Sequence, residues 1–317
     1  MKSGLKGRSL LTLMDWTPEE VRSILDLSHK VKKERQTGKL PQRFRGRTIA
    51  LLFEKRSTRT RCAFETAFGE EGGHPVFLSS EDLHLGVKET LEDTARVLGR
   101  MFDAIQYRGF RQSTVETLAA WSRVPVYNGL TDEWHPTQVL ADLMTMEEVF
   151  GTLGGRKLAF VGDGRNNVAN TLLVGCTQMG VNISIAAPPS LSPLAERVEW
   201  AVAMGRRTGA KVEVVADPAS GVSGADVVYT DVWVSMGEED KGAERIALLS
   251  PYQVNQELME KTGKKDSVFL HCLPAVKGKE VSEEVIEGPS SRVWDEAENR
   301  KHTVKALMLA TLDAPQT

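Results

Sequence analysis

The segment 54–64, EKRSTRTRCAF, concentrates side chains that bind anions. Four basic residues alternate with three hydroxyl-bearing residues, directly after the apolar run 49–53. Ser57 and Thr58 are candidate caps of a following helix, whose first turn offers unpaired N–H groups and the positive end of the helix dipole. Arg59 adds a guanidinium group that suits bidentate phosphate binding. The pattern favours an anion site over a solvated basic loop, and the lack of a GxxxxGK[ST] sequence argues against a nucleotide P-loop.

The segment 161–170, VGDGRNNVAN, matches a dinucleotide-binding turn only in its first half. Asn167 stands where the third glycine would fall, and the next apolar run, NISIAAPP, ends without an acidic residue. A lone G-x-G is weak evidence, so we expect no NAD site. Asn167 is then either a ligand contact at a helix N-terminus or the cap of that helix.

Two further polar segments carry candidate ligand contacts. In HPTQ (135–138), Pro136 suits the first turn of a helix, and His135 and Gln138 lie three residues apart, so both can reach one point above that helix end. A purely structural role for His135 is an equal alternative. In DVWVSMG (231–237), Asp231 and Ser235 place a carboxylate and a hydroxyl around one loop, which suits an ammonium group.

The segment HCLP (271–274) places a thiol at the end of an apolar run. His271 beside Cys272 raises the possibility of a metal site. Adjacent residues of a strand point to opposite faces, so we expect neither a shared metal ion nor a Cys/His nucleophile pair. No metal and no organic cofactor are therefore expected.

Short apolar runs alternate with amphipathic segments along the chain, which indicates an α/β fold with two doubly wound parallel sheets. Ligands of such sheets bind at the carboxyl ends of strands, so the polar segments above are expected to share a cleft. The predicted strands are 47–53, 74–78, 103–108, 124–129, 157–163, 182–188, 211–217, 226–232 and 267–272. The predicted helices are 17–35, 60–71, 90–101, 113–122, 137–150, 167–179, 192–208, 251–261 and 295–312.

The glycines of GTLGGRK place a domain boundary near 150–155, between a helix and a fresh strand. We therefore expect one domain over 1–150 and a second over 151–294. The final helical segment, within 295–317, either caps the second domain or returns to the first.

Composition restricts the class of protein. The chain has 317 residues and a net charge of −3, which argues against a general nucleic-acid or membrane-surface binder. No apolar stretch reaches the roughly 18 residues of a membrane helix, and the N-terminus lacks a secretory apolar core. The three cysteines are far apart, so disulfides are not expected, and we expect a cytoplasmic protein.

Taken together and in order, STRTR, HPTQ and HCLP resemble the aspartate/ornithine carbamoyltransferase family. The similarity covers essentially the whole chain and includes DTARVLGRM, YRG, GDGRNN and DEAENRKHT. DVWVSMG is similar to the loop that marks the ornithine branch. The resemblance implies a carbamoyl-phosphate-binding first domain, an ornithine-binding second domain, and a last helix that returns to the first.

The resemblance also implies roles for individual residues. Arg108, His135, Asp231 and Cys272 are implied in catalysis, and Cys272 with the Leu273 backbone would lie close to the attacking δ-amine. The implied carbamoyl-phosphate contacts are Ser57, Thr58, Arg59, Thr60, His84, Arg108, His135, Gln138, Cys272, Leu273 and Arg300. The implied ornithine contacts are Asn167, Asp231, Ser235 and Met236.

The implied reaction is carbamoyl transfer from carbamoyl phosphate to the δ-amine of L-ornithine, giving L-citrulline and phosphate, as in arginine metabolism. Aspartate, putrescine and N-acetylornithine are alternative acceptors, and a phosphate-binding module without turnover is an alternative of another class. The family inserts the loop around His84 into a neighbouring subunit's site, which implies a homo-oligomer built from trimers. DVWVSMGEEDKGAER is a candidate lid.

Overall fold

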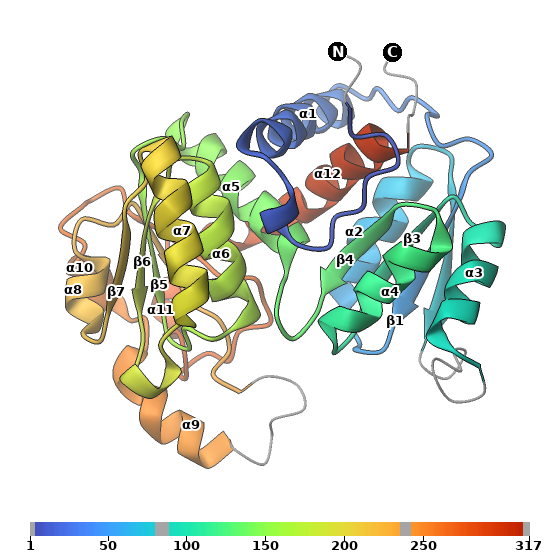
Figure 1. Ribbon diagram of the computed structural model, residues 1–317. Helices are drawn as coiled ribbons and strands as arrows, with labels where there is room; N and C mark the ends of the chain where they lie inside the picture. Colours follow the sequence, from blue (N-terminus) through green and yellow to red (C-terminus); the bar gives the residue numbers. More distant parts are fainter. Residues whose placement is uncertain (1–3, 80–88, 235–241, 313–317) are drawn as a thin grey trace. The chain divides into compact units, whose positions relative to one another are not determined.

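A computed structural model describes residues 4–79, 89–234 and 242–312. The chain divides into two compact units (Figure 1). The first unit comprises Met1–Met144 with Glu298–Thr317, and the second comprises Thr145–Ala297. The two crossings between the units fall inside helices α5 (Pro136–Phe150) and α12 (Val293–Thr311). Each unit is built around one parallel sheet.

The sheet of the first unit has the strand order β2-β1-β3-β4 among the described residues. Its strands are β1 (Thr48–Phe53), β2 (His74–Ser79), β3 (Ala104–Arg108) and β4 (Val126–Leu130). The chain runs from β1 outward to β2 and then returns to the other side for β3 and β4. The topological switch therefore lies between β1 and β3, where ligands of such sheets bind.

Helices cover both faces of this sheet. On one face, α3 (Leu91–Met101) and α4 (Gln112–Ser122) pack on a core that includes Leu52, Ile105 and Tyr107. On the other face, Phe64 of α2 (Thr58–Gly69) stacks on Tyr127, with the ring centroids 6.1 Å apart. Helix α1 (Pro18–Gln36) begins at a capping box formed by Thr17 and Glu20, and a short 3₁₀ turn spans Leu13–Asp15.

The sheet of the second unit has the order β7-β6-β5-β8-β9 among the described residues. Its strands are β5 (Lys157–Val161), β6 (Asn182–Ala186), β7 (Val212–Val215), β8 (Val227–Tyr229) and β9 (Val268–Leu270). Here the switch lies between β5 and β8. Helices α6 (Asn167–Gln178) and α7 (Ala195–Thr208) lie side by side in Figure 1.

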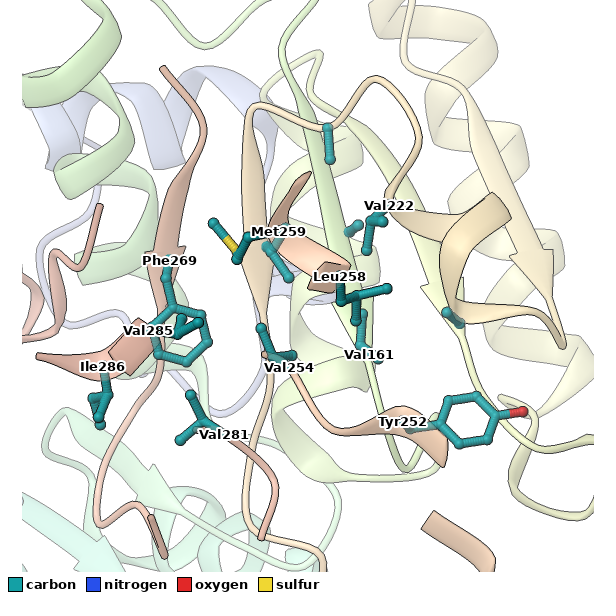
Figure 2. Close-up of a cluster of buried hydrophobic side chains, with 14 of the residues drawn as sticks. Val161, Val222, Tyr252, Val254, Leu258, Met259, Phe269, Val281, Val285 and Ile286 are labelled. Carbon is teal, nitrogen blue, oxygen red and sulfur yellow. The ribbon is translucent and has the colours of Figure 1, made fainter. Parts of the chain in front are cut away.

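Short helices complete the second unit around an apolar cluster. Figure 2 shows Val222 of α8 (Pro218–Val222), Leu258 and Met259 of α10 (Gln256–Glu260), and Val285 and Ile286 of α11 (Glu283–Ile286) among the buried side chains. Val161 of β5 and Phe269 of β9 belong to the same cluster. The remaining elements are α9 (Gly242–Leu249) and 3₁₀ turns at Pro189–Leu191 and Ser250–Tyr252.

The predicted fold class is confirmed, and each of the nine predicted strands corresponds to a strand in the described residues. Three short helices, α8, α9 and α11, were not predicted. Of the predicted polar lid, 231–245, residues 242–245 belong to helix α9, and residues 235–241 lie outside the described residues. The predicted helix 251–261 is wrong in its first half, where a 3₁₀ turn at Ser250–Tyr252 precedes α10.

The last helix returns to the first unit, as the resemblance implied. The hydroxyls of Thr311 and Tyr127 lie 2.7 Å apart, and Arg47 donates to the carbonyl oxygen of Leu312. Lys305, which is almost fully buried, pairs with Glu70 at 2.7 Å. No helix of the described residues combines the length and apolar character needed to cross a membrane.

Glu70 is the central carboxylate of this attachment. Burial raises its pKa, but the ammonium groups of Lys305 and Lys301 outweigh burial and lower the pKa to about 2. Because the folded state favours the charged form, this contribution is present above the ordinary carboxyl pKa and is lost as the pH falls through about 2.

We expect Glu70→Gln to lower the free energy of unfolding at neutral pH by about 2 kcal/mol, because it leaves Lys305 buried without its closest partner. The difference from wild type should shrink as the pH falls from about 4.3 toward 2. Urea unfolding at several pH values measures both effects. Glu213→Gln is the matched control, because Glu213 pairs with Lys157 at 3.0 Å but is 54% exposed. Equal stability of Glu70→Gln and wild type at neutral pH would contradict the prediction.

Candidate active site

The end of β1 leads directly into the N-terminus of α2. Ser57 is the cap residue, and its hydroxyl accepts a hydrogen bond from the backbone N–H of Thr60 at 3.2 Å. Thr58, the other candidate cap, is instead the first residue of the helix and is exposed. The predicted arrangement of strand, cap and helix end is therefore present, with the cap assigned to Ser57.

The four basic residues of segment 54–64 do not form one patch. Lys55 lies 2.5 Å from Asp132, and Arg61 pairs with Glu65 at 2.9 Å. Arg56 is exposed. Only Arg59 acts on His135, where its charge contributes to a lowered pKa. The fold thus separates cations that the sequence presents as equivalent.

Buried polar side chains from four elements meet at Thr60. Arg108, the last residue of β3, donates to the Thr60 hydroxyl at 3.2 Å, and Arg300 of α12 donates to it at 3.3 Å. Arg300 also donates to the side-chain carbonyl of Gln138 in α5 at 2.5 Å and to the hydroxyl of Thr137 at 3.3 Å. Thr60, Arg108, Gln138 and Arg300 are all buried. Thr137 was not predicted from the sequence.

His135 directly precedes α5 and is buried beside this cluster. Burial lowers its pKa well below the usual value, and the positive charges of Arg300, Arg108 and Arg59 lower it further. The ring is therefore a neutral imidazole at physiological pH. Three guanidinium groups acting on one buried ring give this region a positive potential, which suits an anionic ligand.

A bulge in β4 makes room for the cluster. The pairing of β3 with β4 shifts from Tyr107–Asn128 to Arg108–Leu130, so Gly129 is the extra residue. A Cβ atom at Gly129 would lie 2.5 Å from Nε2 of Gln106 and 3.0 Å from Cγ2 of Thr60. Gly129 therefore permits the close approach of Thr60 to the end of the sheet.

In the second unit, Asp231 lies just beyond β8 at the topological switch. Its carboxylate accepts hydrogen bonds from the side-chain amide of Asn166 at 2.8 Å, the thiol of Cys272 at 3.1 Å and the backbone N–H of Val232 at 2.8 Å. Asn166, which was not singled out from the sequence, is also the cap of α6. Asn167 is the first residue of that helix, so the alternative that Asn167 is the cap was wrong.

The loop after β9 is held by buried side chains. Nδ1 of His271 accepts the backbone N–H of Leu273 at 2.8 Å, and its Nε2 lies 3.5 Å from the carboxylate of Glu280. Leu273 adopts a positive φ of 57° and precedes a cis peptide bond to Pro274. The tight turn brings the thiol of Cys272 within hydrogen-bond distance of the carboxylate of Asp231.

The sequence argument that His271 and Cys272 point apart was wrong. β9 ends at Leu270, so strand geometry does not apply to the next two residues. Possible ligand atoms of His271, Cys272 and Asp231 all lie within 4.8 Å of one another. Nδ1 of His271 is bonded to Leu273 of the same loop, and the thiol of Cys272 is bonded to Asp231, which follows β8. The expectation that no metal is needed stays a prediction.

Three predicted site residues, His84, Ser235 and Met236, lie outside the described residues. The other predicted residues form two groups. The first unit holds Ser57, Thr58, Arg59, Thr60, Arg108, His135, Gln138 and Arg300, and the second holds Asn167, Asp231, Cys272 and Leu273.

Two family models match the chain in succession. A model described as "Aspartate/ornithine carbamoyltransferase, carbamoyl-P binding domain" matches residues 8–148, and one described as "Aspartate/ornithine carbamoyltransferase, Asp/Orn binding domain" matches residues 154–311. An ornithine carbamoyltransferase from Caldanaerobacter subterraneus subsp. tengcongensis is 65% identical over 98% of this chain and 100% of its own length. One from Pseudothermotoga lettingae is 63% identical over 98% and 100%.

A solved structure gives the same similarity in three dimensions. The structure of ornithine carbamoyltransferase from Pyrococcus furiosus matches with a TM-score of 0.96 and 44% sequence identity. The match covers 100% of both chains. The similarity therefore extends over both units.

We expect Gly129→Ala to weaken binding of inorganic phosphate and to lower stability by about 1–3 kcal/mol, because the added Cβ overpacks Gln106 and Thr60. Thermal unfolding and a phosphate titration by calorimetry measure the two effects. Gly69→Ala is the matched control, because no atom lies within 4 Å of a Cβ at that position. If Gly129→Ala and Gly69→Ala behaved alike, the packing role of Gly129 would be wrong.

Proposed function

The chain belongs to the aspartate/ornithine carbamoyltransferase family, and we propose that it transfers the carbamoyl group of carbamoyl phosphate to the δ-amine of L-ornithine, giving L-citrulline and phosphate. One structural observation carries the anion half of this proposal: Arg108 and Arg300 converge on the Thr60 hydroxyl beside the N-terminus of α2. The names of the close relatives support ornithine as the acceptor.

We assign carbamoyl-phosphate binding to the domain formed by residues 1–150 and 295–317, and ornithine binding to residues 151–294. In the first, the phosphate is proposed to bind at the N-terminus of α2, where Ser57, Thr58, Arg59 and Thr60 supply hydroxyl, guanidinium and backbone donors. A helix N-terminus favours a dianion through its N–H groups and its dipole. His84 is proposed to add a contact from a neighbouring subunit.

The carbonyl oxygen of the carbamoyl group gains negative charge as the amine attacks. Both lone pairs of the Thr60 hydroxyl accept bonds from Arg108 and Arg300, so its proton is available for donation. We propose that Thr60, Arg108 and the neutral ring of His135 stabilise this oxygen. Removing one such donor typically lowers the rate about 10²–10³-fold.

Gln138 and Arg300 are proposed to hold the carbamoyl amide end. The side-chain carbonyl oxygen of Gln138 accepts a hydrogen bond from Arg300. Its amide nitrogen donates to the buried carboxylate of Asp142 at 2.8 Å, which fixes the orientation of the side chain. This oxygen is the acceptor that we propose for the carbamoyl NH₂ group.

The ornithine half is proposed to centre on Asp231. A carboxylate offers about four lone-pair positions, and three bonds to Asp231 are already made by Asn166, Cys272 and Val232. The remaining capacity suits one bond from the δ-amine, which Asp231 would orient while Cys272 and the Leu273 backbone lie close by. Asn167, Ser235 and Met236 are proposed to contact the amino-acid end.

The δ-amine must lose a proton before it can attack. A free alkylammonium has a pKa of about 10.4, and desolvation in a closed site lowers that value. Positioning and electrostatic stabilisation suffice for the transfer, so we propose no cofactor. We also infer a homo-oligomer built from trimers, a cytoplasmic location and a role in arginine metabolism, all from the family resemblance.

Purified protein should form citrulline from carbamoyl phosphate and ornithine. Aspartate, putrescine and N-acetylornithine, assayed in parallel, should give no product. Asp231→Asn should lower kcat with ornithine by about 10²-fold or more, because the amine loses its orienting carboxylate. Turnover with another amine would overturn the ornithine assignment. Phosphate binding without turnover of any amine would favour the binding-module alternative.

The ring of His135 should remain neutral in the free enzyme at pH values below an ordinary histidine pKa of about 6.5. The neutral form is the one favoured by burial and by the surrounding guanidinium groups, and it is lost only as the pH falls through the lowered pKa. NMR of ring-labelled histidines measures this, with His135→Asn identifying the signal. A titration midpoint near 6.5 would contradict the prediction.

A further inference from the structure

Lys55 lies in the segment that leads to the proposed phosphate site, yet its ammonium group faces another loop. Nζ lies 2.5 Å from the carboxylate of Asp132 and 4.4 Å from the centre of the Phe110 ring. The side chain of Lys55 is only 8% exposed, whereas that of Asp132 is 57% exposed. Lys55 is therefore a buried cation that reaches outward to a carboxylate beside an aromatic face.

The residues that Lys55 joins belong to three different strand ends. Lys55 follows β1, Phe110 follows β3, and Asp132 follows β4. Each of these strand ends carries a part of the proposed carbamoyl-phosphate site a few residues away. These parts are Arg59 and Thr60 after β1, Arg108 at the end of β3, and His135 after β4.

Backbone hydrogen bonds connect the same three strand ends. The N–H groups of Glu54 and Lys55 donate to the carbonyl oxygen of Arg108 at 2.9 and 3.4 Å. The N–H of Asp132 donates to the carbonyl oxygen of Phe110 at 2.8 Å. The Lys55–Asp132 ion pair adds a side-chain contact between the residues that follow β1 and those that follow β4.

We propose that Lys55 and Asp132 form a positioning pair that fixes the phosphate-binding segment of α2 relative to His135. The inference rests on the proposed function of that segment. Lys55 acts through the geometry of Arg59, Thr60 and His135 and does not bind the phosphate itself. Small displacements of such groups weaken a site whose contacts depend on hydrogen-bond geometry.

The test compares Lys55→Met, Asp132→Asn and the double variant in the full-length protein. We expect each single variant to raise KM for carbamoyl phosphate on the order of tenfold, with a smaller change in kcat. The KM of the double variant should be no higher than that of the more impaired single variant, because both changes remove the same interaction. Lys55→Arg, which retains the charge, should recover part of the loss.

Lys157→Met and Glu213→Gln form the matched control, a similar ion pair at 3.0 Å at the start of β5. These variants should leave KM unchanged. Calorimetric titration with inorganic phosphate gives a second readout that does not require turnover. If wild type bound phosphate without forming citrulline, the proposed function would fail, while the phosphate affinities of the variants would still test the pair.

Three results would overturn the proposal. If Asp132→Asn left KM and phosphate affinity unchanged while Lys55→Met weakened both, Lys55 would be a direct phosphate ligand. Unchanged values in both variants would mean that the pair does not position the site. Equal losses in the Lys157 and Glu213 variants would mean that the effect comes from general loss of stability.

Discussion

The concentration of guanidinium groups around His135 is the constraint on which the first unit depends. Arg108 and Arg300 are buried, and moving charge out of water is costly unless hydrogen bonds and opposite charge compensate. The hydroxyl of Thr60 and the amide of Gln138 supply part of this compensation, and an anionic substrate would supply more. Because Arg300 belongs to the last helix, the cluster requires α12 to return to the first unit. The ion pair of the buried Lys305 with the partly exposed Glu70 holds that helix in place.

The same topological rule determines where the candidate site residues lie in both units. Each sheet reverses its strand order once, between β1 and β3 in the first unit and between β5 and β8 in the second. Neighbouring strand ends diverge at such a point, which leaves room for side chains and ligand. Thr60 and Arg108 meet at the first switch, and Asn166 and Asp231 meet at the second. A bulge at Gly129 and the turn after β9 then set the positions of individual side chains near these switch points.

Strands and the main site segments could be predicted because their signals are local. A short apolar run followed by Ser, Thr and Arg predicts a strand, a helix cap and a helix end that suits an anion. Side-chain partners could not be predicted in this way, because they come from distant segments. Lys55 and Arg59 have the same charge in the sequence, but only the fold brings Asp132 to Lys55. Likewise, the choice of Asn166 over Asn167 as cap depends on where the helix begins, by a single residue.

The charged side chains at the two candidate sites have opposite signs, as the proposed substrates require. The first unit gathers guanidinium groups near a neutral imidazole, an environment that attracts a dianion and repels an ammonium group. The second presents the carboxylate of Asp231, which attracts an ammonium group and repels a phosphate. The two proposed substrates would therefore be distinguished by charge before any detailed contact forms.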